Sequence, residues 1–232
     1  IQYYLQQGKE NNLYRKLKNI NSLIDFSSND YLGLSRSAYI KQQVEIDAKN
    51  YLHHKSGATG SRLLNGNSEL FEDVEFLLAK THHAEAALLF NAGFDANVGL
   101  ISTVVRPNDT IFYDELVHAS IHQGMQLSGA KLVPFKHNDM LDLENLLKET
   151  TYDIAFLITE SIFSMEGDKA DLEKIAELST TYKVALIVDE AHATGLFGSG
   201  GSGLCNLAKM EAKCFARVYT FGKAIGSHGA VV

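Results

Sequence analysis

The protein is a chain of 232 residues that is 45% hydrophobic and 21% charged, a composition typical of globular proteins and not of disordered ones. Its formal net charge of −7, with basic residues scattered among acidic ones, argues against a nucleic-acid-binding or anionic-membrane-binding surface. The apolar runs are far shorter than the roughly 20 residues that a membrane span requires, and no charged-then-apolar leader opens the chain, so we expect a cytoplasmic protein.

The first 55 residues are predicted to form a segment that packs over a site, not a separate domain. They contain a basic amphipathic stretch at 13–19 and a short strand-like run at 23–27, and a glycine-rich loop follows at 57–67. We therefore divide the chain into an N-terminal segment, residues 1–55, and a large domain, residues 56–232. The chain starts without a methionine and stops inside a strand-like run, so we expect the large domain to be truncated.

Beyond this segment, apolar β-rich runs alternate with amphipathic helical stretches, which predicts an α/β fold. Several runs are apolar on both faces, as strands are when helices cover both sides of a mostly parallel sheet. The predicted strands are 86–90, 110–115, 131–135, 154–160, 184–190 and 217–223. The predicted helices are 68–80, 139–149 and 171–182, opened by Ser68, Asp139 and Asp171. Turns are predicted at 106–109 and 136–139.

Two strand ends carry the residues with the clearest chemical potential. The run VALIVDEAHATG ends a buried strand in Asp189 and brings His192 close behind it, at the sheet edge where open α/β folds bind ligands. The run RVYTFGKAIG places Lys223 between glycines and three residues after Thr220, and glycines admit a flat ligand close to the backbone. Each residue has a plain alternative, because Asp189 can cap a turn and Lys223 can be a surface cation.

Taken together, these residues match the needs of pyridoxal 5′-phosphate. An aspartate against the pyridine nitrogen keeps it protonated, and a lysine that holds the aldehyde as an imine activates the ring as an electron sink. The phosphate needs donors, and residues 90–100 offer a strand, a glycine turn and a helix start, where free N–H groups attract an anion. Gly93 and Phe94 are the predicted donors, although the same pattern fits a plain helix cap.

Two further side chains follow predicted strands. His118 comes after the strand that ends near Asp114, so its imidazole can stack on a planar ring, with a structural histidine as the alternative. Ser164 comes after the strand that ends at Glu160, where its hydroxyl can bond the phenolic oxygen of the ring. Both positions lie at the sheet edge that carries Asp189.

No metal site is expected. The histidine pairs at 53–54 and 82–83 each end a helix and are interpreted as solvated helix ends, because adjacent helical residues do not face each other and make poor bidentate ligands. Cys205 and Cys214 have neither metal-ligand nor redox spacing and are interpreted as incidental reduced thiols.

The motifs, in this order along the chain, resemble those of the α-oxoamine synthases. They are FSSNDYLGL (26–34), GATGSR (57–62), NAGFDAN (91–97), HAS (118–120), FSMEGD (163–168), DEAHATGLFG (189–198) and TFGKAIG (220–226). Members of this family are fold-type I pyridoxal-phosphate enzymes that condense an amino acid with an acyl-CoA and release CoA and carbon dioxide. The resemblance implies that the large domain is a fold-type I PLP-transferase domain whose mostly parallel sheet is sandwiched by helices.

The resemblance also implies roles around the cofactor ring. Lys223 would form the Schiff base and act as the base, Asp189 would contact the pyridine nitrogen, and His118 would stack on the ring face. His192 and Ser164 would bond the phenolic oxygen. His118 is further placed to bond the reacting carboxylate or ketone of the substrate.

Phosphate-binding and substrate-binding residues follow in the same way. Gly93 and Phe94 would hold the phosphate, and Thr220 would assist, across the interface of a homodimer whose active site lies between subunits. Arg15 and Asn29 match positions that line the substrate site. Arg15 and Thr220 depend mainly on the resemblance.

The FSS before NDYLGL and the FG turn after DEAHATG favour the branch of the family that condenses L-alanine with pimeloyl-CoA in biotin biosynthesis. The alternative is the branch that joins glycine to acetyl-CoA. Val117 and Ala224 depart from the family pattern, but neither departure removes a polar group assigned to chemistry. The family also has a C-terminal domain that carries an arginine for the amino acid's carboxylate, so this chain alone is expected to bind cofactor poorly and turn over little.

Two readings of other classes remain. One is a non-catalytic partner subunit of a heteromeric synthase, against which the retention of Lys223, Asp189 and His118 speaks. The other is a nucleotide-binding α/β domain, although neither GxGxxG nor GxxxxGK[ST] occurs in the chain.

Overall fold

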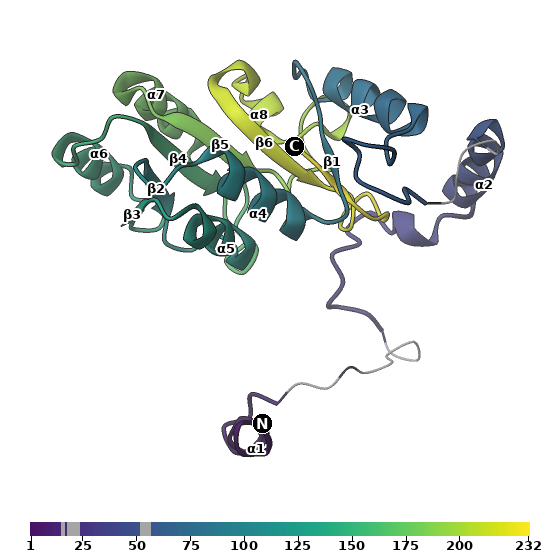
Figure 1. The fold of residues 1–232 in the computed structure, drawn as a ribbon, viewed down its shortest axis with the longest axis horizontal. Coiled ribbons are helices and arrows are strands. Elements are labelled where there is room, and N and C mark those ends of the chain that lie inside the picture. The colour runs from purple at the N-terminus through teal and green to yellow at the C-terminus, as the bar shows by residue number, and fades with distance from the viewer. Residues whose placement is uncertain (15–16, 18–23, 52–56) are drawn as a thin grey trace.

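The computed structural model describes residues 1–14, 17, 24–51 and 57–232, and within them the chain forms one seven-stranded sheet between two layers of helices (Figure 1). The strands are β1 (Leu89–Phe90), β2 (Thr110–Asp114), β3 (Lys131–Phe135), β4 (Ala155–Glu160), β5 (Ala185–Asp189), β6 (Cys214–Thr220) and β7 (Ala230–Val231). The α-helices are α1 (Gln2–Glu10), α2 (Ala38–Asp47), α3 (Glu69–Thr81), α4 (Gly93–Val104), α5 (Ala119–Ser128), α6 (Met140–Glu149), α7 (Leu172–Tyr182) and α8 (Leu204–Leu207).

The sheet has the strand order β1-β7-β6-β5-β4-β2-β3. Neighbouring strands from β6 through β5, β4 and β2 to β3 run parallel, whereas β7 is antiparallel to both β1 and β6. The helices α4 and α5 pack together on one side of the sheet, and α6 and α7 lie on the other (Figure 1). The predicted α/β class and mostly parallel sheet are confirmed.

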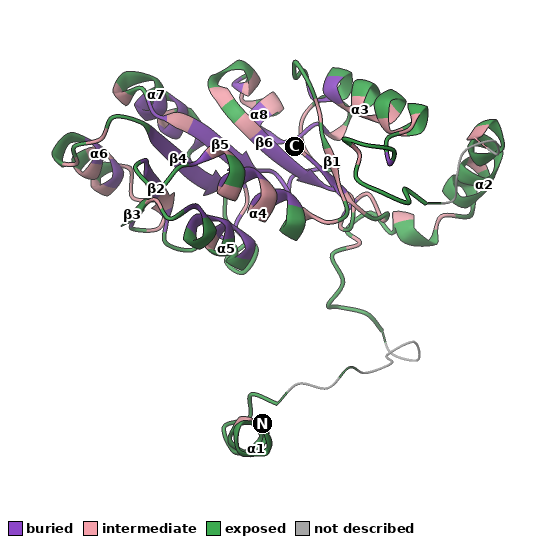
Figure 2. Cartoon of the chain, in the orientation of Figure 1, coloured by how far each residue is buried: buried purple, intermediate pink, exposed green. Residues whose placement is uncertain are grey.

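Double coverage by helices explains why the central strands are apolar on both faces. All six residues of β4 are buried, as are four of the five residues of its neighbour β5, and the central strands are largely buried in Figure 2. Phe112, Leu157 and Ile187 in adjacent strands are at most 1% exposed. Burial of these apolar side chains holds the sheet edge in place.

The helix starts agree with the sequence where a side chain can cap. Asp139 accepts hydrogen bonds from the backbone N–H groups of Leu141 and Asp142, and Asp171 accepts one from Lys174. Ser68 stands at the N-cap of α3 but makes no side-chain capping bond. The predicted strand at 86–90 is reduced to its last two residues.

The predicted strand-like run at 23–27 is wrong for the part that is described. Residues 24–27 belong to no strand. Asp25 Oδ1 instead accepts hydrogen bonds from the backbone N–H groups of Ser27 and Ser28, at 2.9 and 3.0 Å, which makes a turn.

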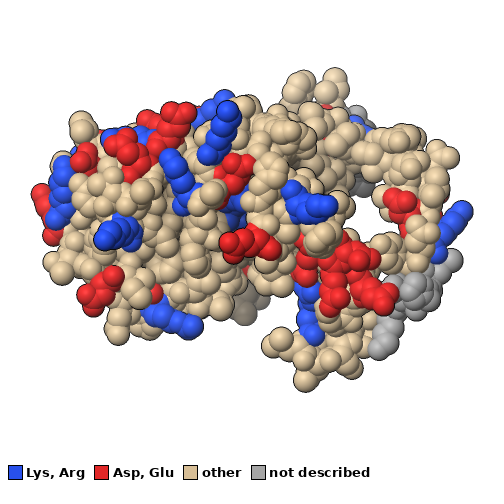
Figure 3. All heavy atoms as spheres, turned by 90° about the horizontal axis from the view of Figure 1, so that it is seen from above, with Lys and Arg blue, Asp and Glu red and all other residues tan. Residues whose placement is uncertain are grey.

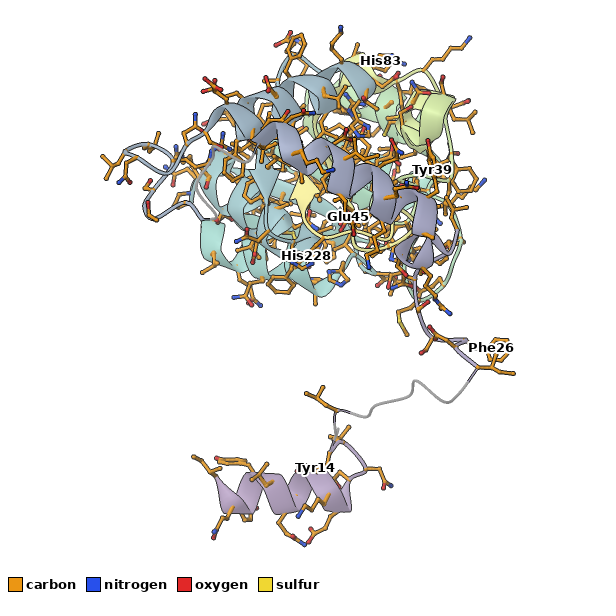
Figure 4. The ribbon with its side chains drawn as sticks, turned by 90° about the vertical axis from the view of Figure 1, so that its right-hand side faces the viewer. Tyr14, Phe26, Tyr39, Glu45, His83 and His228 are labelled. Carbon is orange, nitrogen blue, oxygen red and sulfur yellow. The ribbon has the colours of Figure 1, made fainter. Side chains whose placement is uncertain are left out.

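The beginning of the chain makes few contacts with the sheet. Helix α1 has no buried residue and lies apart from the α/β body, and Phe26, on the segment that follows, is 92% exposed (Figure 4). Further along, Asn29 lines a cavity at the sheet edge and Tyr31 contacts His192. The predicted division of the chain after residue 55 stays a prediction.

The surface matches the composition. On the face drawn in Figure 3, Lys and Arg side chains are interspersed with Asp and Glu side chains, without a continuous basic patch. Among the described helices, none is both long and apolar enough to cross a membrane.

A histidine in the turn after β3 joins two loops at the carboxyl edge of the sheet. His137 Nδ1 lies 2.9 Å from Asp114 Oδ1, and Nε2 lies 3.0 Å from Asp168 Oδ2. Because ionised carboxylates only accept hydrogen bonds, both ring nitrogens must donate, which requires the charged imidazolium. Burial opposes this charge, but the hydrogen bonds to Asp114 and Asp168 outweigh it and raise the pKa of His137 above its ordinary value.

Replacing His137 with Gln should therefore destabilise the protein in a pH-dependent way. The histidine's contribution is complete below its unfolded pKa of 6.5 and is lost as the pH rises through the raised folded-state pKa. In urea unfolding near pH 6, we expect the variant to lose about 1–3 kcal/mol. The deficit should shrink near pH 9. An equal deficit at both pH values, or the same profile in the exposed control His228→Gln (Figure 4), would contradict this account.

Candidate active site

Most of the predicted residues meet in a cavity of about 240 Å³ at the carboxyl edge of the parallel strands. Strand ends, the start of α4 and the start of α5 all contribute to its wall. The residues named from the sequence that line it are Asn29, Gly93, Phe94, His118, Asp189, Thr220 and Lys223. Lys223 and Asp189, the pair on which the cofactor prediction depends, thus face the same space.

Three other predicted residues are placed differently. His192 does not line the cavity but contacts Lys223, with 2.7 Å between His192 Nε2 and Lys223 Nζ. Ser164 is exposed in the loop after β4, and the structure does not bring it to the cavity lining. Arg15 lies outside the described residues.

Lys223 follows β6 in a tight loop and is half-buried. Burial lowers the pKa of its amine, although the nearby Asp189, and Glu160 when it is ionised, act in the opposite direction. A lowered pKa increases the fraction of neutral amine, the form that attacks a carbonyl carbon.

Asp189 is the last residue of β5 and is 5% exposed. Its Oδ2 accepts a 2.7 Å hydrogen bond from Asn97 Nδ2, and its Oδ1 accepts a 2.8 Å bond from the backbone N–H of Ala191. Asn97 also donates to Ser120 Oγ at 3.0 Å. These donors hold the carboxylate at the cavity. The sequence analysis did not identify Asn97 and Ser120 as site residues.

The sequence does contain a signal for Asn97. It lies four residues after Gly93 in α4, so both residues share one face of the helix. Because Gly93 was assigned to the cavity, its helical neighbour at this spacing was a candidate as well.

Glu160, at the end of β4, is a third residue that the sequence analysis missed. Its Oε1 accepts a 2.6 Å hydrogen bond from the backbone N–H of His118, and its side chain lines the cavity. Burial, together with the charge of Asp189, raises the pKa of Glu160 to about 8, so the carboxyl is protonated at neutral pH.

His118 caps the N-terminus of α5, and its Nδ1 lies 2.8 Å from Ser120 Oγ. Burial lowers the pKa of His118, which favours the neutral imidazole. Two contacts therefore position His118 at the cavity. Its side chain accepts a hydrogen bond from the Ser120 backbone N–H, and its own backbone N–H donates to Glu160. A neutral aromatic ring held in this way suits stacking on a planar ligand.

The start of α4 is suited to an anion. Its N-cap residue, Ala92, has no side-chain acceptor, so no side chain satisfies the first N–H groups of this twelve-residue helix. A Cβ built on Gly93 would lie 3.4 Å from Thr220 Oγ1, which shows how closely the hydroxyl approaches the helix start. The helix start therefore presents backbone donors at the cavity, and Asp95 is the acidic residue of its first turn.

A larger cavity, of about 710 Å³, lies between α3 and β6 and contains none of the predicted chemistry. Its wall includes His82, and the prediction that this histidine is solvated is wrong. The ring is 6% exposed and stacks on Tyr219 with centroids 3.7 Å apart, and burial lowers its pKa to about 4. His83 is exposed and pairs with Glu211, as a helix-end residue can.

The remaining histidine and metal predictions are simpler. The pair at 53–54 lies outside the described residues. Within the part of the chain that the structure describes, no group of three or more His, Cys, Asp or Glu side chains is arranged to hold a metal ion.

Comparison with known sequences gives a consistent assignment. A family model described as aminotransferase class I and II matches residues 21–232. A curated 8-amino-7-oxononanoate synthase from Emericella nidulans is 43% identical over 241 residues, which cover 97% of this chain and 58% of that protein. The chain thus spans little more than half the length of this curated relative.

Solved structures extend the likeness to the fold. The 8-amino-7-oxononanoate synthase from Francisella tularensis superposes with a TM-score of 0.74 at 33% identity, over 91% of this chain and 58% of that one. The serine palmitoyltransferase from S. paucimobilis, with a bound PLP-myriocin aldimine, superposes with a TM-score of 0.81 at 30% identity, over 88% of this chain and 51% of that one.

The raised pKa of Glu160 predicts that Glu160→Gln makes the cofactor-free protein more stable at alkaline pH. The folded state keeps Glu160 protonated up to about pH 8, whereas the unfolded chain ionises near 4.5, so the wild-type protein loses stability as the pH rises between these values. Gln retains the acceptor for the His118 N–H and does not ionise. Between about pH 5 and pH 8, urea unfolding should shift in the variant's favour by about 2–4 kcal/mol.

The exposed Glu166 provides a matched control for this experiment. Glu166→Gln should leave the pH profile of unfolding as in the wild-type protein. If Glu160→Gln and the wild-type protein show parallel profiles as well, Glu160 is not the buried proton carrier described here.

Proposed function

The chain belongs to the class I and II aminotransferase family, and from that premise we propose that it binds pyridoxal 5′-phosphate in the cavity at the carboxyl edge of the sheet. The observation that carries the proposal is that a half-buried lysine and a buried aspartate line one cavity with an uncapped helix N-terminus. This set offers a nucleophile for the aldehyde, a carboxylate for the pyridine nitrogen and donors for the phosphate.

The comparisons with known proteins identify the branch of this family to which the chain is similar. The resemblance to the α-oxoamine synthases and the fold-type I architecture are confirmed by relatives and structures named 8-amino-7-oxononanoate synthase and serine palmitoyltransferase. That a solved neighbour carries the cofactor in its name supports the same cofactor here.

Each residue of the cavity has a distinct task under this proposal. Lys223 would hold the cofactor through its amine, and the same amine would remove the proton from the substrate Cα. Asp189, held by Asn97, keeps the ring nitrogen protonated. When bound, the cofactor supplies the electron sink that makes this proton acidic. His118 covers the ring face, where it is also in place to bond the substrate's carboxylate or ketone.

The phosphate and the phenolic oxygen have their own partners. The phosphate would be bound by the backbone N–H groups of Gly93 and Phe94 and by the hydroxyl of Thr220. His192 is assigned to the phenolic oxygen because its Nε2 already lies at the Lys223 amine. Ser164 shares this assignment only if its exposed loop moves toward the cavity.

For the substrates, we propose L-alanine and pimeloyl-CoA, which give 8-amino-7-oxononanoate with release of CoA and carbon dioxide. The name of the 43% identical relative supports this choice over glycine and acetyl-CoA. Arg15 and Asn29 are proposed to line the substrate site, and Asn29 borders the cavity. The complete enzyme is proposed to be a cytoplasmic homodimer, by analogy with its family.

A direct test is the absorbance of the Schiff base that Lys223 forms with pyridoxal 5′-phosphate. In the complete enzyme, the wild-type protein should develop this absorbance, Lys223→Ala should lose it completely, and the exposed control Lys213→Ala should keep it. Persistence of the absorbance in Lys223→Ala would refute the assignment of the lysine.

Substrate choice is tested by the CoA released from each pair of substrates. With the complete enzyme, we expect release with L-alanine plus pimeloyl-CoA and little with glycine plus acetyl-CoA. The reverse order would identify the glycine branch, and a bound cofactor without release from either pair would favour a non-catalytic partner subunit.

A further inference from the structure

A chain of hydrogen bonds leads from Lys223 to the exposed segment before α2. Lys223 Nζ lies 2.7 Å from His192 Nε2, and His192 Nδ1 lies 2.8 Å from the Tyr31 hydroxyl oxygen. The Tyr31 hydroxyl donates in turn to Asn29 Oδ1 at 3.1 Å. His192 is 9% exposed, whereas Tyr31 is 47% exposed. The chain thus connects the amine in the cavity with the protein surface.

The chemistry of the four groups gives this chain a direction. The Tyr31 hydroxyl donates its proton to Asn29 Oδ1, so the Tyr31 oxygen is left to accept a hydrogen bond from His192 Nδ1. The proton of the neutral ring then sits on Nδ1, and Nε2 is left to accept an N–H from the Lys223 amine. Burial lowers the pKa of His192 to about 4, and the charge that Lys223 carries when protonated acts in the same direction, so the ring is neutral at neutral pH.

The segment that carries Tyr31 is held against the loop that carries Lys223. Gly226 has φ +66°, and a Cβ built on it would collide with the backbone of Leu34 and Ser35. Only glycine combines this left-handed conformation with so close an approach. Within the segment that carries Tyr31, Asp30 Oδ2 accepts a 2.6 Å hydrogen bond from the Ser35 hydroxyl. Tyr31 therefore meets His192 from a fixed position.

We propose that Tyr31 is a positioning residue that locks His192 in the Nδ1–H tautomer and thereby keeps the lone pair of the neutral Lys223 amine free. When the proton is on Nδ1, Nε2 is a hydrogen-bond acceptor. The Lys223 amine then donates an N–H to Nε2, and its lone pair stays free. In the opposite tautomer, Nε2–H donates to the amine nitrogen and blocks the electron pair that must attack the cofactor aldehyde. This inference rests on the proposed function of Lys223.

The test replaces Tyr31 with Phe, which removes the hydroxyl and keeps the ring. In the cofactor-free protein, ¹⁵N NMR of the imidazole nitrogens should show His192 as the Nδ1–H tautomer in the wild type and as a mixture in Tyr31→Phe. After mixing with pyridoxal 5′-phosphate, the rate of Schiff-base formation should fall about tenfold, the loss expected for one hydrogen bond.

Tyr39→Phe is the matched control, because Tyr39 is 71% exposed on α2 (Figure 4). It should change neither the tautomer nor the rate. An unchanged tautomer in Tyr31→Phe, or a changed tautomer with an unchanged rate, overturns the inference. If the wild-type protein forms no Schiff base, the proposed function of Lys223 fails together with the role inferred for Tyr31, whereas a wild-type Schiff base with no effect of Tyr31→Phe rejects the inference alone.

Discussion

The parallel pairing of β4, β5 and β6 forces their carboxyl ends to one edge of the sheet. In register, Glu160 of β4 stands beside Asp189 of β5, and Asp189 stands beside Val218 of β6, two residues before Thr220. The loop after β6 then returns Lys223 to this edge. Residues separated by tens of positions in the sequence thus face one cavity because the strands between them are buried and apolar. The cofactor site depends on this register.

Burial drives most ionisable groups around the cavity toward their neutral forms. It lowers the pKa of His118, His192 and Lys223, and it raises the pKa of Glu160. Asp189 receives hydrogen bonds from Asn97 and from the Ala191 backbone, which hold its carboxylate at the cavity. This placement suits a contact with a pyridine nitrogen.

The sequence was sufficient for features that depend on local pattern. Apolar runs predicted the sheet, Asp139 and Asp171 predicted helix starts, and the strand ends predicted that Asp189 and Lys223 face one site. Contacts between distant segments carry no such pattern. Tyr31 meets His192 across 161 positions, and Asn97 meets Asp189 across 92.

The errors have the same origin. His82 ends a helix, where solvent is the usual neighbour, but Tyr219 of β6 covers it. The run at 23–27 has strand-forming residues, yet among the described residues it has no partner strand, and Asp25 bends it into a turn. Tertiary packing overrides the local expectation at His82, and hydrogen bonds from the backbone to the Asp25 side chain override the strand propensity of the run at 23–27.

A crystal structure of the protein with pyridoxal 5′-phosphate tests the central claim most directly. The account predicts continuous density between Lys223 Nζ and the ring, an Asp189 oxygen within hydrogen-bonding distance of the pyridine nitrogen, and the phosphate at the N-terminus of α4. A ring whose nitrogen contacts no carboxylate, or a cofactor in the cavity beside His82, would contradict it.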